Sequence, residues 1–145
     1  MAKVLPPLRF VLQELLPVGY TVLAGPPKLG KSWLLLQLGL AVAAGEDLFG
    51  QGTAQGAALY LALEDGEHRM QGRMRRLLGD RAPPAGLSIA TKWPRLDAGG
   101  MAEIELWAKA NGDAARLCII DTTQKIKPPP GRFGTPRDHT EGRRR

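Results

Sequence analysis

One short stretch, GPPKLGKS at residues 25–32, combines residue types suited to holding phosphate groups. Gly25 and the run Gly30-Lys31-Ser32 fit the spacing G-x-x-x-x-G-K-[ST]. A triphosphate needs several hydrogen-bond donors that converge on a small volume, and the backbone N–H groups of a tight, glycine-bearing loop supply them. Lys31 reaches the β and γ phosphates as a point charge, and the Ser32 hydroxyl is a ligand for Mg²⁺. The stretch therefore predicts a site for ATP with Mg²⁺.

The predicted nucleotide contacts cover this whole loop and the residue after it. They are Gly25, Pro26, Pro27, Lys28, Leu29, Gly30, Lys31, Ser32 and Trp33. Lys31 is assigned to catalysis as well as to binding, because its charge acts on the phosphates that react. Trp33 is most simply a packing residue, and contact with the ligand is its alternative role. For the loop as a whole, the alternative is a glycine-rich turn before an ordinary core helix.

Two carboxylates follow apolar runs further along the chain. Asp121 ends the run LCIID, and Glu64 ends the run LYLALE. Ligands bind at the carboxyl ends of the strands in open α/β sheets, so Asp121 is assigned to Mg²⁺, with a hydrogen bond from Ser32. Glu64 is assigned as the base that polarises the attacking water. Two alternatives stay open: Asp121 caps the next turn, or Asp65 is the base and Glu64 only caps the helix that follows.

The elements that position these residues alternate along the chain. Short apolar runs predict buried strands at 20–25, 57–64, 87–91 and 116–122, and longer amphipathic or apolar runs predict helices at 8–16, 30–45, 65–79 and 99–112. Alternating strands and helices predict an α/β fold with a mostly parallel sheet and helices on both faces. The glycine loop would then lie where its motif requires, directly after a strand and at the start of a helix.

Composition and charge divide the chain into a body and a tail. The 145 residues suit one domain, and 43% are hydrophobic, enough for a core. The net charge is +6, but seven Lys/Arg and two Asp/Glu lie from Lys125 onward, so the first 124 residues carry only +1. We therefore expect a domain at 1–127 and a disordered basic tail at 128–145, rich in Pro, Gly and Arg. The charge argument for nucleic acid rests on this tail alone.

The remaining bulk features favour a cytoplasmic protein. The N-terminus does not have the pattern of a signal peptide, and no apolar stretch reaches the length of about 18 to 20 residues needed for a membrane span. The single cysteine, Cys118, cannot form an internal disulfide and is interpreted as a buried structural thiol.

A row of arginines marks the helix predicted at 65–79. Arg69, Arg73 and Arg76 share one face at i, i+4 and i+7, while Met70, Met74, Leu77 and Leu78 form the apolar stripe. A solvated helix face is the simplest interpretation of this row. Contact with DNA, or with a nucleotide bound by a neighbouring subunit, is the alternative.

Three stretches together resemble a known family of ATPases. They are LPVGYTVLAGPPKLGKSWLLLQLGLAVAAG, ALYLALEDGEHRMQGRMRRLL and RLCIIDTTQKIKP. Across residues 8–128 they are similar to the RecA-like AAA-family P-loop ATPases related to the plasmid hexameric replicative helicase RepA. The resemblance implies a RecA-type core in which Lys31 and Ser32 contact phosphate and Mg²⁺, Glu64 is the catalytic glutamate and Asp121 the second acidic motif. It also implies a DNA-linked role in replication, with single-stranded DNA and a ring-shaped homo-oligomer as partners.

The chain departs from that family after Lys127. The resemblance implies a further helix and an apolar strand there, but PPPGRFGTPRDHTEGRRR has one large apolar residue, Phe133. We therefore expect a truncated core without its C-terminal strands, and a tail like the product of a shifted reading frame.

Three functions remain open from the sequence. The first is an ATP-binding domain of a DNA helicase-type ATPase, which hydrolyses ATP if the truncated core is competent. The second is a small-molecule kinase with the same loop, which would leave a phosphorylated acceptor where an ATPase would release free phosphate. The third is a non-catalytic nucleotide-binding fragment or a decayed reading frame.

Overall fold

The computed structural model describes residues 5–129. The strands are β1 (Phe10–Leu12), β2 (Leu16–Pro17), β3 (Ala57–Ala62), β4 (Leu87–Ala90) and β5 (Ala115–Asp121). The helices are α1 (Lys31–Ala44), α2 (Glu67–Leu78) and α3 (Gly100–Asn111), with three short 3-10 turns near the ends of α3 and after β5. Of the tail predicted at 128–145, residues 130–145 lie outside the described residues.

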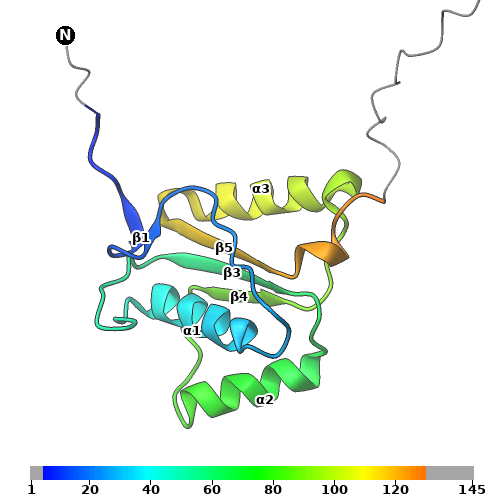
Figure 1. Ribbon diagram of the computed structural model, residues 1–145, viewed down its shortest axis with the longest axis horizontal. Helices are drawn as coiled ribbons and strands as arrows, with labels where there is room; N and C mark the ends of the chain where they lie inside the picture. Colours follow the sequence, from blue (N-terminus) through cyan, green and yellow to red (C-terminus); the bar gives the residue numbers. More distant parts are fainter. Residues whose placement is uncertain (1–4, 130–145) are drawn as a thin grey trace, which may run out of the picture.

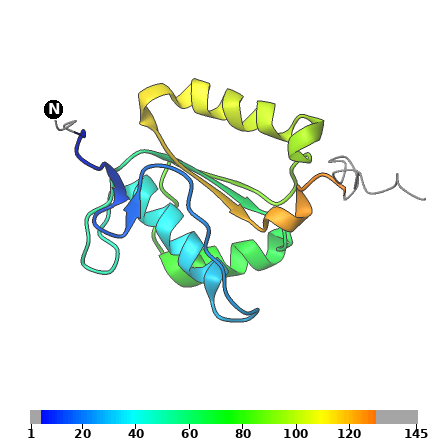
Figure 2. The same ribbon diagram turned by 45° about the horizontal axis from the view of Figure 1, so that its top comes forward.

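A three-stranded parallel sheet forms the centre of the fold. Its order is β4-β3-β5, with Tyr60 of β3 opposite Ile89 on one side and Ile119 on the other. All six residues of β3 are buried, as expected for a central strand covered on both faces. Helices α1 and α2 cover one face of the sheet and α3 lies over the other (Figures 1 and 2). The α/β class, the parallel sheet and the helices on both faces are confirmed.

The main core lies between the sheet and the two helices on its first face. Its buried members are Leu36, Leu40, Tyr60, Ala62, Met70 and Ile119. The apolar stripe predicted for α2 packs here, with Met70 buried and Met74, Leu77 and Leu78 partly buried. Helix α1 ends as predicted at Gly45, whose left-handed φ of 72° lets its N–H close the last turn on the carbonyl of Ala41. This packing fixes the start of α1 against the ends of β3 and β5.

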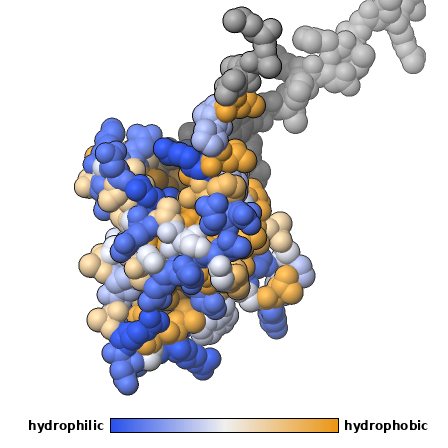
Figure 3. Space-filling model, turned by 90° about the vertical axis from the view of Figure 1, so that its left-hand side faces the viewer, coloured by the Kyte–Doolittle hydropathy of each residue, from blue (hydrophilic) through white to orange (hydrophobic). Residues whose placement is uncertain are grey.

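The helix predicted at 8–16 is wrong, because this segment forms the antiparallel pair β1–β2. Val11 and Leu12 of β1 are buried, whereas Leu8 and Leu15, which the helical spacing also counted, are 77% and 57% exposed. The backbone of β1 bonds to a distant segment, since the N–H of Ala54 donates to the carbonyl of Val11 at 2.8 Å. Figure 3 views the molecule from this side, where apolar groups reach the surface between hydrophilic ones.

The strand predicted at 20–25 is also absent. This segment has no strand pairing, and Tyr20 and Val22 are 88% and 67% exposed. Both edges of β3 are taken by β4 and β5, and the outer edge of β5 pairs with no strand in the described part of the chain. The segment therefore runs as extended, exposed chain from the hairpin to α1, beside the sheet instead of within it (Figure 1).

Cys118 differs from its predicted role as a buried thiol. It lies on β5 and its side chain is exposed, because β5 is an edge strand that α3 covers only in part. Enough protein surrounds the sulfur to reduce the hydration of the thiolate, and this desolvation raises the pKa of the Cys118 thiol to about 11. The cysteine is thus accessible but weakly nucleophilic at neutral pH.

Candidate functional site

The glycine loop ends in a turn that exposes backbone donors at the start of α1. Gly30 has φ of 88° and Lys28 has φ of 64°, so both adopt the left-handed conformation. No side chain caps the first turn of α1, which leaves its N–H groups directed out of the helix end. A helix start of this kind favours negative charge through its unpaired donors and its dipole.

The loop curls tightly over Gly25. A Cβ atom at this position would lie 3.3 Å from the Leu29 side chain and 3.8 Å from Cδ of Lys31, so a larger residue would fill the hollow. The Lys31 ammonium donates to the carbonyls of Gly25 and Pro26 at 2.7 and 2.6 Å. The lysine charge is therefore held at the centre of the loop. A close approach that favours glycine, a central cation and free helix donors fit a polyphosphate group.

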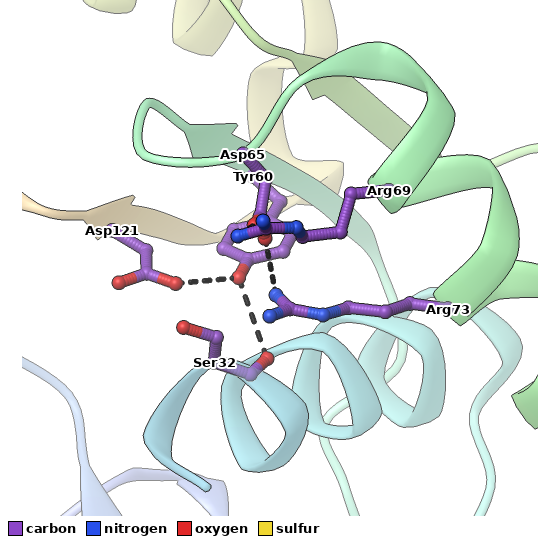
Figure 4. A network of polar contacts seen from close by, with 6 residues as sticks. All are labelled: Ser32, Tyr60, Asp65, Arg69, Arg73 and Asp121. Atoms are coloured by element: carbon purple, nitrogen blue, oxygen red, sulfur yellow. Dashed lines mark hydrogen bonds and ion pairs between the residues drawn. The ribbon is translucent and has the colours of Figure 1, made fainter. Parts of the chain in front are cut away.

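A buried tyrosine links the start of α1 to the end of β5. The Tyr60 hydroxyl donates to Oδ2 of Asp121 at 2.9 Å and lies 3.4 Å from the Ser32 carbonyl oxygen. Figure 4 shows the Ser32 side chain and the Asp121 carboxylate on the same side of this tyrosine. Burial raises the pKa of Tyr60 well above its usual value of 10.0, and the negative charge of Asp121 adds to the shift. Tyr60 therefore stays protonated and acts as a fixed donor to Asp121.

The two neighbouring acids at the end of β3, Glu64 and Asp65, have different surroundings. Asp65 is buried and accepts hydrogen bonds from Arg69, at 3.3 Å, and from Arg73. Glu64 is exposed, and none of the hydrogen bonds or ion pairs of the described residues involves its side chain. Neither residue caps α2, whose N-cap is Gly66 without a side-chain cap bond, so the capping alternative is wrong. Asp65 serves instead as the anchor for two arginines of α2 (Figure 4).

The sheet register brings the ends of β3 and β5 together. Ala62 lies opposite Asp121, and the N–H of Leu63 donates to the Asp121 carbonyl at 2.7 Å. Glu64, one residue further on, is therefore at the same edge of the sheet as Asp121. The structure thus gathers Lys31, Ser32, Glu64 and Asp121 around one end of the sheet. It does not supply the hydrogen bond predicted from Ser32 to Asp121, since the donor to that carboxylate is Tyr60.

The described residues could hold a magnesium ion only with help from a ligand. They contain no group of three or more His, Cys, Asp or Glu side chains arranged around a metal. Ser32 and Asp121 together offer two oxygen ligands, and Mg²⁺ in such sites usually completes its shell with substrate phosphates and water. The donor set therefore fits magnesium that arrives with a nucleotide.

The comparison with protein-family models decides the family. The model described as "AAA domain" matches residues 1–130. The chain belongs to the AAA domain family. It is therefore a nucleotide-binding, ATPase-type domain, which confirms the coarser part of the interpretation drawn from the sequence. No curated protein and no solved structure matches this AAA domain. Within residues 5–129, none of its helices has the length and apolar character required to span a membrane.

Sequence reasoning missed two parts of this AAA domain site. Tyr60 was counted only as one apolar residue of a buried strand, although a buried phenol needs a partner for its hydroxyl. A lone tyrosine in the run AALYLALE was the available signal. The pairing of Asp65 with Arg69 and Arg73 was also missed, although Asp65 and Arg69 have the i, i+4 spacing of a helical ion pair. Tyr60 holds the predicted Asp121, whereas Asp65 holds two arginines of α2.

Proposed function

We propose that this AAA domain binds Mg·ATP through residues 25–33. In this proposal the loop N–H groups and Lys31 hold the β and γ phosphates, while Ser32 and Asp121 hold Mg²⁺. The observation that carries it is the Tyr60 hydroxyl, which joins the Ser32 end of the loop to the Asp121 carboxylate. The close approach of Leu29 and Lys31 to Gly25 and the central position of the Lys31 ammonium support the same assignment.

ATP hydrolysis is the second part of the proposal, with Glu64 as the base that polarises water. The two neighbouring acids differ in a way that favours Glu64. Asp65 is buried, and both of its carboxylate oxygens are already engaged by guanidinium groups, so they are not available to contact an attacking water. Glu64 is exposed at the same edge as Asp121. Bound Mg²⁺ would offset the charge that develops on the phosphates, and Lys31 would do the same from the protein.

The finer role rests on the sequence resemblance. We propose that the domain belongs to a DNA helicase-type ATPase of replication, which acts on single-stranded DNA as a ring-shaped homo-oligomer. In the described chain the outer edge of β5 is open, and segment 20–25 pairs with no strand. A single strand added between β5 and segment 20–25 would pair with both of them. These two features support an incomplete sheet of RecA type.

A second candidate function is nucleotide binding without turnover. Two observations favour it. The Lys31 ammonium bonds to the loop's own carbonyls, and the segment before the loop is not anchored in the sheet. A loop held firmly only at α1 would recognise phosphate but position it poorly for attack.

A titration with a fluorescent Mg·ATP analogue tests the binding. We expect saturable binding by the wild type and a loss of at least about tenfold in Lys31→Ala, since a charge-assisted hydrogen bond contributes about 1.5–3 kcal/mol. Lys109→Ala removes the same charge from an exposed position in the last turn of α3, outside the loop, and serves as the control, with affinity expected within about twofold. Equal affinities for wild type and Lys31→Ala would overturn the assignment of the loop.

Release of free phosphate separates the two candidates. Glu64→Gln should keep analogue binding and lower phosphate release by about 100-fold or more, because general base catalysis contributes roughly 10²–10⁴. Glu67→Gln, at an exposed acid in the first turn of α2, is the control and should release phosphate like the wild type. Wild-type binding without any phosphate release would favour the non-catalytic candidate. Loss of binding in Glu64→Gln would mean that Glu64 has a structural role.

A further inference from the structure

A pocket of about 340 Å³ opens between α1 and α2, and Trp33 is the one predicted nucleotide contact in its lining. It is lined by Trp33, Arg69, Gly72, Arg73 and Arg76. Every charged side chain in this lining is a guanidinium. The three arginines are the helix face that the sequence singled out, and the structure adds a tryptophan from α1 to it.

The charges around this pocket do not cancel. Arg69 and Arg73 share the single carboxylate of Asp65, and Arg76 takes part in none of the ion pairs found among the described residues. Three guanidinium groups against one carboxylate leave a net charge of +2 beside the pocket. The Arg69 side chain is 70% exposed, so the positive charge is open to solvent and to a ligand.

An aromatic ring forms another wall of the pocket. The Arg73 guanidinium lies 5.4 Å from the centroid of the half-buried Trp33 ring, within the range of a cation–π contact. This contact and the bond from Arg73 to Asp65 fix the orientation of the guanidinium and of the ring. The pocket therefore combines a preorganised aromatic surface with cations, which is the pairing that stacks a base and contacts its phosphates.

Gly72 lines the pocket without a side chain. It lies inside α2, where glycine costs about 1 kcal/mol of helix stability relative to alanine. A Cβ atom at this position would meet nothing within 4 Å, so the glycine is not required by close packing. Because glycine has no side chain, free volume remains between Arg69, Arg76 and Trp33.

We propose that this pocket binds one nucleotide unit of a single-stranded nucleic acid. The base lies against Trp33 over Gly72, and Arg69 and Arg76 contact the flanking phosphates. Planar guanidinium groups suit phosphate oxygens, and an aromatic wall accepts any base. An acidic peptide would satisfy the arginines but would make no use of the ring. This inference rests on the single-stranded DNA partner proposed above, but it does not require that the loop bind ATP.

Fluorescence anisotropy with a labelled oligo-dT of about 15 nucleotides tests it, on the full chain, in EDTA and without ATP. Gly72→Leu fills the pocket without a change of charge and with a better helix former. We expect it to weaken binding at least about fivefold, because stacking of one base contributes about 1–3 kcal/mol. Arg76→Ala should weaken binding to a similar extent and lower the slope of log K against log salt by about 0.7.

Arg75→Ala is the matched control, since Arg75 is an exposed arginine of the same helix that does not line the pocket. The affinity of Arg75→Ala for oligo-dT should stay within about twofold of the wild-type affinity, and the slope of log K against log salt should not change. Equal losses in Arg75→Ala and Arg76→Ala would overturn the proposal, as would full affinity in a folded Gly72→Leu. Competition by polyglutamate as strong as that by oligo-dT, with the same sensitivity to Gly72→Leu, would identify an acidic-protein site instead.

Discussion

Tyr60→Phe tests how the two halves of the nucleotide site are held together. Tyr60 is fully buried in β3, and the nearer acceptor of its one hydroxyl proton is Asp121, at 2.9 Å. Phenylalanine keeps the packing of the ring and removes only the hydroxyl group. A hydrogen bond to a charged acceptor contributes about 1.5–3 kcal/mol, and Asp121 is only half-buried, so water replaces part of it. We expect the free energy of unfolding to fall by about 1.5 kcal/mol at pH 7.

The same substitution has a predictable pH dependence. In the unfolded chain tyrosine ionises near pH 10, whereas burial raises the pKa of Tyr60 in the folded protein far above that value. The stabilisation from Tyr60 is therefore complete below pH 10 and decreases as the pH rises further. By pH 11 the wild type loses about 1.4 kcal/mol that Tyr60→Phe does not lose, so the two proteins should have nearly equal stability there.

Urea denaturation at pH 7 and pH 11 measures this difference, with an unchanged m-value as evidence that the native state is the same. Tyr20→Phe is the matched control, because the only other tyrosine is 88% exposed and should have no effect at either pH. Titration with the ATP analogue, with and without Mg²⁺, adds a functional measurement. Tyr60→Phe should reduce the gain in affinity that Mg²⁺ brings. A stability difference that is the same at both pH values would refute the fixed-donor role of Tyr60.

Two further predictions concern the sheet around the site. Cys118 is exposed, but burial of its sulfur raises the pKa of its thiol from 9.0 to about 11. At pH 8 it should therefore react with a disulfide reagent about tenfold more slowly than an ordinary thiol. A rate equal to that of free cysteine would contradict this prediction. Gly56→Ala should lower the free energy of unfolding by about 2 kcal/mol, because the added Cβ would clash with the Ala114 carbonyl and the Arg116 side chain. Gly52→Ala is the control, because its Cβ would make only ordinary contacts, and its free energy of unfolding should change by less than about 0.5 kcal/mol. Thermal or urea unfolding measures both changes.

The sequence predicted the three strands of the parallel sheet, but only β3 is buried throughout as predicted, whereas β4 and β5 at the sheet edges are partly exposed. Ala57–Ala62 is covered on both faces, so its apolar run reports its environment directly. The segment at 8–16 forms strands although its apolar residues have helical spacing, because its backbone partners lie near residue 54. Local periodicity carries no information about a partner forty residues away, and that pairing overrides the helical pattern.

The segment at 20–25 shows a different limit of sequence reasoning. Its residues favour a strand, but a strand also needs a neighbour with free backbone groups. In the described chain both edges of β3 are occupied, and β5 offers its outer edge without receiving this segment. The sequence therefore predicted α1, α2, α3 and the three strands of the parallel sheet, but it missed β1 and β2 and could not predict which strands pair with each other.

The residues of the candidate site could be predicted where a short sequence motif identifies them, but not where their role depends on contacts between distant elements. Lys31, Ser32, Glu64 and Asp121 follow from motif spacing and from the ends of apolar runs. The role of Tyr60 could not follow in the same way, because its hydroxyl bridges to residues 28 and 61 positions away. Only the register of β3 with β5 creates that bridge.

Arg73 connects the nucleotide site with the pocket on α2. Its guanidinium binds the buried Asp65, which directly follows Glu64, and it also lies over the ring of Trp33, which directly follows Ser32. In the proposed complex the base lies against Trp33, so it would change the surroundings of the arginine that holds Asp65 beside Glu64. We therefore expect the proposed binding in the pocket and the proposed binding in the loop to be coupled, and by linkage the coupling is reciprocal. Oligo-dT should change the affinity for the ATP analogue by the same factor by which the analogue changes the affinity for oligo-dT.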